Sequence, residues 1–161
     1  MKRFLHPTEA VLAVFLASAP VHAEGDHGGH AQGEAFSAGE SGDSKKPARI
    51  VQVTMTEADG KMLFAPNRIE IKKDEQVKFM LRNTGELDHE FVLATTGENL
   101  KHDEAVNKNS DMEHDDPNAK RLAPKKMGEM VRKFSKIGEF EYSCLIPGHR
   151  EAGMIGTIVV K

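Results

Sequence analysis

The chain has 161 residues, of which 39% are hydrophobic and 6% are aromatic, with a single cysteine and no tryptophan. A chain of this length is enough for one folded domain and hardly for two. Its formal net charge of −3 provides no basic field of the kind that attracts nucleic acid, so that class of partner is excluded.

The N-terminal residues predict an export signal. Lys2 and Arg3 precede an apolar run of ten residues at 10–19, and a small-x-small cleavage pattern ends at Ala23. This is the order of regions in a secretory signal peptide, and ten apolar residues are too few to cross a bilayer. We therefore expect residues 1–23 to be removed, which leaves a periplasmic protein with no membrane span.

Residues 24–47 predict a disordered tail, because they are rich in Gly, Ser, Ala, His and acidic residues and contain almost nothing to bury. His27 and His30 within this tail could bind a metal loosely, although a solvated linker is the favoured interpretation. The folded domain is expected to cover residues 48–161.

From residue 50 onward, the chain contains short segments that alternate apolar and polar residues. Such alternation predicts β-strands with one buried face. The expected strands cover residues 50–56, 68–72, 76–82, 90–94, 129–134, 138–144 and 154–160. About seven short strands with turn signals between them predict an all-β, antiparallel sandwich.

A long polar insert at residues 95–126 interrupts this rhythm before the last strands. It contains Pro117 and Pro124, and a short helix is expected around residues 99–106. Ordered connections of this length usually carry function.

The segment from Cys144 to Met154 carries three metal-binding side chains on one loop. His149 lies five residues after Cys144, and Met154 lies five residues after His149. A thiolate, two imidazoles and a weak axial thioether form the ligand set of blue copper. The second imidazole must come from elsewhere, and His89 is best placed because it starts another expected strand. Loops at one end of a sandwich cluster together, so His89 can reach the same point.

Three other interpretations of this loop remain open on the residues alone. Cys144 and Met154 could be core side chains, and His149 could be an ordinary loop histidine. Zinc is the rival metal, although a thioether is a poor zinc ligand. A Cys–His thiol enzyme would need an orienting third group and an oxyanion hole, which the sequence does not display.

The insert also predicts a second, weaker Cu(I) site. His102, Met112 and His114 lie within the insert, and Met127 follows just beyond it. Thioethers and imidazoles together suit Cu(I). The competing interpretation is a solvated acidic loop whose methionines cap the core.

Residues 48–161 resemble the cupredoxins, which include plastocyanin, azurin, pseudoazurin and auracyanin. The motif that carries this resemblance consists of Tyr142, Cys144, His149, Met154 and Gly156, with His89 upstream. The resemblance implies a Greek-key β-sandwich with one type 1 copper, which alternates between Cu(I) and Cu(II). By position, His89, Cys144 and His149 would be equatorial ligands, and Met154 would be axial. The insert makes the chain look more like periplasmic copper-tolerance cupredoxins of the CopI type than like photosynthetic carriers.

Two positions depart from the cupredoxin pattern. Many cupredoxins have Asn after the first histidine and Ser or Thr after the cysteine, and these side chains help to tie the two ligand segments together. Here the corresponding residues are Glu90 and Leu145. The sequence therefore lacks the usual pair of side chains that clamps such a site.

The predicted function is copper handling in the periplasm, which means binding, buffering or detoxifying copper ions. The alternative is a soluble electron-transfer cupredoxin, which would shuttle electrons between redox partners through an exposed edge of His149. The His-rich tail and the insert favour handling, since a pure electron carrier needs neither. An enzyme such as a cuprous oxidase is disfavoured, because only one good metal site is evident. The expected protein partner is a redox or copper-transfer protein.

Overall fold

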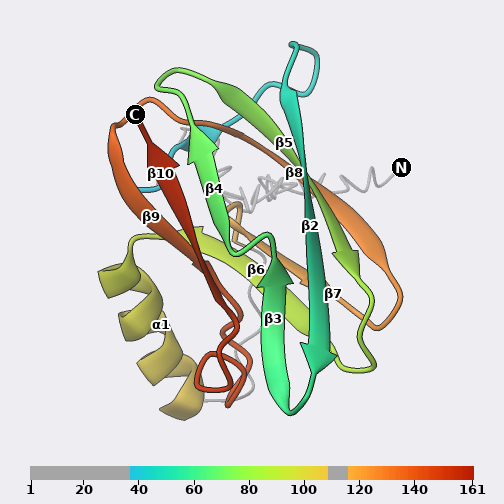
Figure 1. Cartoon of the computed structure of the whole chain (residues 1–161). Coiled ribbons are helices and arrows are strands. Elements are labelled where there is room, and N and C mark those ends of the chain that lie inside the picture. The colour runs from blue at the N-terminus through green and yellow to red at the C-terminus, as the bar shows by residue number, and fades with distance from the viewer. Residues whose placement is uncertain (1–36, 109–115) are drawn as a thin grey trace, which may run out of the picture. The chain divides into compact units, whose positions relative to one another are not determined.

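The computed structural model describes residues 37–108 and 116–161, which form two five-stranded sheets and one helix (Figure 1). The first sheet contains, in spatial order, β1 (Glu40–Ser41), β8 (Met127–Lys133), β5 (Gln76–Asn83), β2 (Arg49–Ala58) and β3 (Lys61–Ala65). The second contains β4 (Arg68–Ile71), β10 (Ile155–Val160), β9 (Gly138–Ser143), β6 (His89–Ala94) and β7 (Ala119–Leu122). The helix α1 spans Thr96–Lys108. The predicted β-sandwich is confirmed.

Most neighbouring strands run antiparallel, but two pairs are parallel. β2 pairs with β5 so that Val53 lies opposite Leu81, and β4 pairs with β10 so that Ile69 lies opposite Ile158. These two pairs differ from the antiparallel arrangement that the sequence predicts for the sandwich. Alternation along a strand determines which face is buried, whereas strand direction depends on which sheet the next strand joins.

The core lies between the two sheets and is filled by side chains that alternate along the strands. Val53 and Met55 of β2 are fully buried. Phe91 of β6 stacks on Tyr142 of β9 with ring centroids 5.1 Å apart, and it packs against Phe79 of β5 at 5.4 Å. Close aromatic packing of this kind joins the two sheets, so the strand ends that carry the candidate site rest on a rigid support.

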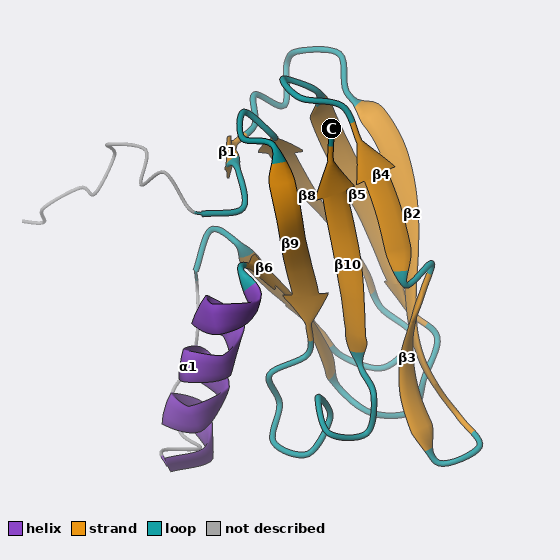
Figure 2. Ribbon diagram, turned by 60° about the vertical axis from the view of Figure 1, so that its left-hand side comes forward, coloured by secondary structure: helices purple, strands orange, loops and turns teal. Residues whose placement is uncertain are grey.

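α1 lies against the second sheet and contacts both β6 and β9 (Figure 2). A capping box sets its start. The Thr95 hydroxyl accepts the N–H of Glu98 at 3.3 Å, and the Glu98 carboxylate accepts the N–H of Thr95 at 2.9 Å. All six residues of β6 are buried, because the core covers one face of the strand and α1 covers the other. The sequence predicts this helix only around residues 99–106, and the structure extends it at both ends.

The insert also contributes β7, which the alternation pattern does not predict. β7 pairs with β6 so that Leu122 lies opposite His89. Residues 116–126 are therefore part of the second sheet and its approach to β8, whereas residues 109–115 lie outside the described residues.

The start of the ordered domain differs from the prediction for residues 24–47. Within residues 37–47, β1 pairs with β8, and Ala38 is fully buried. Gly39 has φ +98°, and a Cβ there would lie 2.6 Å from the carbonyl oxygen of Lys133. The buried side chain of Arg132 donates to the carbonyl of Gly39 at 3.0 Å. Backbone pairing and one buried arginine thus order a segment whose composition offers almost nothing to bury.

Candidate metal centre

The loop between β9 and β10 is folded by its own hydrogen bonds, which bring its candidate ligand residues together. Cys144 follows β9 directly, and its N–H donates to the carbonyl of Met154 at 3.1 Å. The N–H of Met154 donates to the carbonyl of His149 at 3.1 Å. Gly148 and Gly153 have φ +83° and +101°, a region that glycine adopts without strain. The loop therefore folds back on itself, and its backbone bonds hold Cys144, His149 and Met154 close together.

His89 reaches this loop from β6, because β6 pairs with β9. Val92 lies opposite Ser143 in that ladder, so the start of β6 lies beside the end of β9. The N–H of Glu90 donates to Cys144 Sγ at 3.3 Å, which joins the two ligand-bearing segments directly. The residue after the first histidine thus contributes through its backbone, where many cupredoxins use an Asn side chain.

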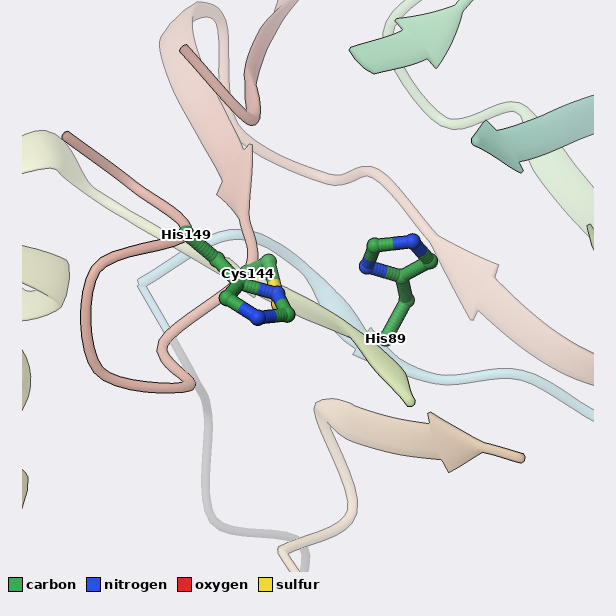
Figure 3. A group of neighbouring side chains, drawn as sticks. All are labelled: His89, Cys144 and His149. Atoms are coloured by element: carbon green, nitrogen blue, oxygen red, sulfur yellow. The ribbon is translucent and has the colours of Figure 1, made fainter. Parts of the chain in front are cut away.

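His89, Cys144 and His149 form a compact, buried cluster (Figure 3). Cys144 Sγ lies 3.4 Å from His149 Nδ1, and the two imidazole ring centroids are 5.2 Å apart. Among residues 37–108 and 116–161, this is the one group of three or more His, Cys, Asp or Glu side chains whose ligand atoms all lie within 4.8 Å of one another. The structure therefore brings together three of the four side chains that the sequence predicts as ligands.

Burial sets the protonation of Cys144 and His149 in the metal-free cluster. Burial raises the pKa of Cys144 to about 12, and burial, followed by the neighbouring His89, lowers the pKa of His149. Near neutral pH, Cys144 in the metal-free cluster is therefore a neutral thiol and His149 a neutral imidazole. His89 Nδ1 is buried without a hydrogen-bond partner. A buried nitrogen with a free lone pair beside a thiol and a second imidazole fits a copper ion, which takes thiolate and imidazole ligands.

Glu57, at the end of β2, is part of this region, although the sequence interpretation does not include it. Its Oε1 lies 2.8 Å from His89 Nε2, and its carboxylate accepts the N–H groups of Glu86 and Leu87 at 3.0 Å each. Burial alone would raise the pKa of Glu57, but these hydrogen bonds and the nearby His89 lower it below its ordinary value. Glu57 is therefore an ionised group in contact with the candidate ligand.

Met154 and Leu145 are both buried beside the cluster. Met154 is fully buried at the start of the return to β10, and Leu145 is 1% exposed. Met154 belongs to the hydrophobic core of the sandwich, and its backbone is hydrogen-bonded to those of Cys144 and His149.

The residues of the predicted second site are placed only in part. His102 lies on α1, and Met127 starts β8 with 63% of its surface exposed. Met112 and His114 lie outside the described residues. The second site stays a prediction.

Across the described ranges, none of the helical structure has the length and apolar character needed to cross a bilayer.

Comparison with known proteins associates this geometry with copper. The family described as copper binding proteins, plastocyanin/azurin family, matches residues 51–161. The chain is 42% identical over 165 aligned positions to the copper-resistant cuproprotein CopI of Rubrivivax gelatinosus, covering 99% of this chain and 98% of that protein. It is 30% identical to CopI of Pseudomonas aeruginosa, covering 81% and 85% of the two chains. The solved structure of auracyanin B superposes with a TM-score of 0.60 at 26% identity, covering 77% of this chain and 96% of auracyanin B.

Proposed function

Because this chain belongs to the plastocyanin/azurin family of copper-binding proteins, and with it to the CopI-type cuproproteins, we propose that it handles copper through a single buried site. His89, Cys144 and His149 would hold the ion, and Met154 would add a weak thioether ligand. The observation that carries this proposal is the buried cluster of two imidazoles and one thiol within 4.8 Å.

A copper ion at this site supplies one-electron chemistry between Cu(I) and Cu(II) when it is bound. The residues of the chain hold the donors in place before binding. The 144–154 loop fixes Cys144 and His149 through backbone bonds, and the N–H of Glu90 holds Sγ against β6. Burial excludes water from the thiol, which protects it from oxidation. Such a preformed site accepts either oxidation state with little rearrangement.

Zinc is the weaker assignment for this site. Structural zinc sites use four strong ligands from Cys and His, and catalytic sites keep three strong ligands and an open position for water. Here a fully buried methionine, Met154, lies at the end of the ligand loop, beside His149 and Cys144. A soft thioether in this position favours copper over zinc.

Copper handling is the role best supported for this chain. Both CopI relatives are described as copper-resistant cuproproteins, and the alignment with the Rubrivivax gelatinosus protein spans nearly the whole of both chains. The export signal predicted at residues 1–23 supports a periplasmic location for this role. The chain acts there as a binding protein rather than as an enzyme, with copper ions as its partner.

Electron transfer is the second candidate function. It depends on how much of His149 and its neighbours is exposed to a redox partner. Electron exchange needs a route from the copper to the protein surface, and His149 is 8% exposed. The neighbouring Ile146 is partly buried, Pro147 is exposed, and Leu145 belongs to the interior. The surface offered to a redox partner is therefore a small edge of one imidazole with two apolar neighbours.

One genetic experiment separates the two roles. The gene is deleted and then complemented with the wild type or with the Cys144→Ser variant, and growth on excess copper and respiratory electron flow are measured together. The proposal predicts copper sensitivity in the deletion strain, rescue by the wild type alone and unchanged respiration. If the deletion strain instead shows reduced respiration and normal copper tolerance, the proposed function is wrong and electron transfer is the function of the chain.

A further inference from the structure

We propose that Glu57 is a positioning residue for the copper ligand His89. The carboxylate of Glu57 keeps the proton of the His89 imidazole on Nε2, so that the free lone pair of Nδ1 points into the copper site. The negative charge of this carboxylate also favours the Cu(II) state. This inference rests on the proposed copper site.

Glu57 reaches His89 from the opposite sheet. Glu57 lies near the end of β2 in the first sheet, whereas His89 is the first residue of β6 in the second. The Oε1–Nε2 distance is 2.8 Å, and the side chains of His89 and Glu57 are 0% and 24% exposed. The contact is thus a short, largely buried bridge between the sheets at the end where the candidate ligands lie.

The turn before His89 is shaped around this carboxylate. Besides bonding to the histidine, Glu57 accepts the backbone N–H groups of Glu86 and Leu87. A Cβ atom at Gly85 would lie 2.1 Å from Glu57 Oε2, so a glycine is required for the carboxylate to take this position. Three donors converge on one acceptor, which fixes both the turn and the ring.

The contact also determines the tautomer of His89. A carboxylate only accepts hydrogen bonds, so Nε2 must carry the proton, and a neutral imidazole then has a bare Nδ1. In His89, Nδ1 is buried and lacks a hydrogen-bond partner. Carboxylates that accept from the outer nitrogen of a ligating histidine fix its orientation and raise its basicity, and their loss typically costs 10–100-fold in metal affinity or activity.

The charge of Glu57 biases the oxidation state. With the Cys144 thiolate, Cu(II) carries a net charge of +1 and Cu(I) a net charge of zero. An anion bonded to a ligand stabilises the more positive state. Removing this charge should therefore favour Cu(I) and raise the reduction potential of the site.

The test compares Glu57→Gln with Glu86→Gln in the full protein loaded with copper. Glu86 lies in the same turn and loses the same charge in this variant, but its side chain pairs with Lys125 instead of His89. In a redox titration, one electron from the titrant reduces Cu(II) to Cu(I). We expect Glu57→Gln to shift this equilibrium about tenfold towards Cu(I), about 59 mV for a one-electron couple. Glu86→Gln should shift it less than threefold. Equal shifts in both variants, or no shift in Glu57→Gln, would overturn the proposal.

A second measurement needs no copper. ¹⁵N NMR of the metal-free wild type should show His89 with a protonated Nε2 and a bare Nδ1, and a proton on Nδ1 would overturn the role of Glu57. If wild-type protein develops no thiolate-to-copper absorption, the proposed copper site is wrong. The tautomer measured in metal-free protein then still decides whether Glu57 positions His89.

Discussion

Arg150, the residue after His149, donates from both of its Nη atoms to the carboxylate of Glu141 on β9. The side chains of Arg150 and Glu141 are 11% and 8% exposed. Glu141 also accepts the Asn99 amide of α1 at 3.2 Å and the Ser143 hydroxyl at 3.1 Å. One carboxylate thus ties the loop that carries His149 to the strand that leads into Cys144 and to the helix of the insert.

Arg150→Met should destabilise the metal-free protein strongly, because it leaves the carboxylate of Glu141 buried without its cation. Breaking a buried ion pair by removing one partner costs about 3–5 kcal/mol, and urea unfolding measures this loss. Arg68→Met is the matched control. Its pair with Glu139 has side chains 56% and 68% exposed, so its loss should cost less than about 1 kcal/mol. Equal losses in the two variants would show that the Glu141–Arg150 pair does not brace the loop.

Glu141 should also make stability depend on pH. Burial alone would raise the pKa of Glu141, but the hydrogen bonds and charge of Arg150, with Asn99 and Ser143, lower it below its ordinary value of 4.5. The unfolded chain therefore binds this proton more readily, so the stabilisation is complete above pH 4.5 and is lost as the pH falls through the folded-state pKa. Urea unfolding of wild type and Glu141→Gln between about pH 6 and about pH 3 measures this dependence. The difference in the free energy of unfolding between wild type and Glu141→Gln should become smaller as the pH falls. A constant difference would show that the carboxylate of Glu141 is not the source of the pH dependence.

The candidate ligands could be predicted from the sequence because their signals are local. Cys144, His149 and Met154 share one short loop whose spacing is set by the chain itself. His89 could be added because a strand start in a sandwich lies near such a loop. Contacts between distant segments carry no comparable signal, which is why β1, β7 and the two parallel strand pairs are found only in the structure.

The alternation of apolar and polar residues along β2 contains a signal for Glu57 that the sequence analysis does not use. Val51, Val53 and Met55 of β2 face the core, and the same period of two carries on to residue 57. A carboxylate at an inward-facing position must be paired, because burying an unpaired charge is costly. The sequence thus contains the signal that Glu57 needs a partner, but not the identity of that partner, because His89 lies on the other sheet.

Met154→Leu tests the axial ligand. Leucine has a volume similar to that of methionine, so this core substitution should cost less than about 1.5 kcal/mol. The Cu(II) protein should keep its thiolate-to-copper absorption while its reduction potential rises, because a weak axial thioether tunes the metal rather than holding it. Visible spectroscopy and redox titration measure the two effects. Loss of all bound copper from this variant would show that Met154 is a principal ligand.

The predicted second copper site can be tested in protein whose main site is disabled. Cu(I) is titrated into mature Cys144→Ser protein that lacks residues 24–36, since residues 37–47 pack on the domain. If His102, Met112, His114 and Met127 bind Cu(I), then Met112→Leu/His114→Ala should weaken this binding at least about tenfold, since thioether and imidazole ligands suit Cu(I). The same affinity in both proteins would rule out this site in the insert.

The most direct test of the copper site is visible absorption during Cu(II) titration of the mature protein. A thiolate bound to Cu(II) gives intense absorption, and here the one thiol of the chain is Cys144. We predict that wild-type protein develops this absorption to saturation at one copper per chain. Cys144→Ser should show none, while urea unfolding confirms that this variant is folded. Equal absorption in wild type and Cys144→Ser, or a folded wild type that binds copper without any such absorption, would contradict the assignment of Cys144 as the ligand at the centre of the site.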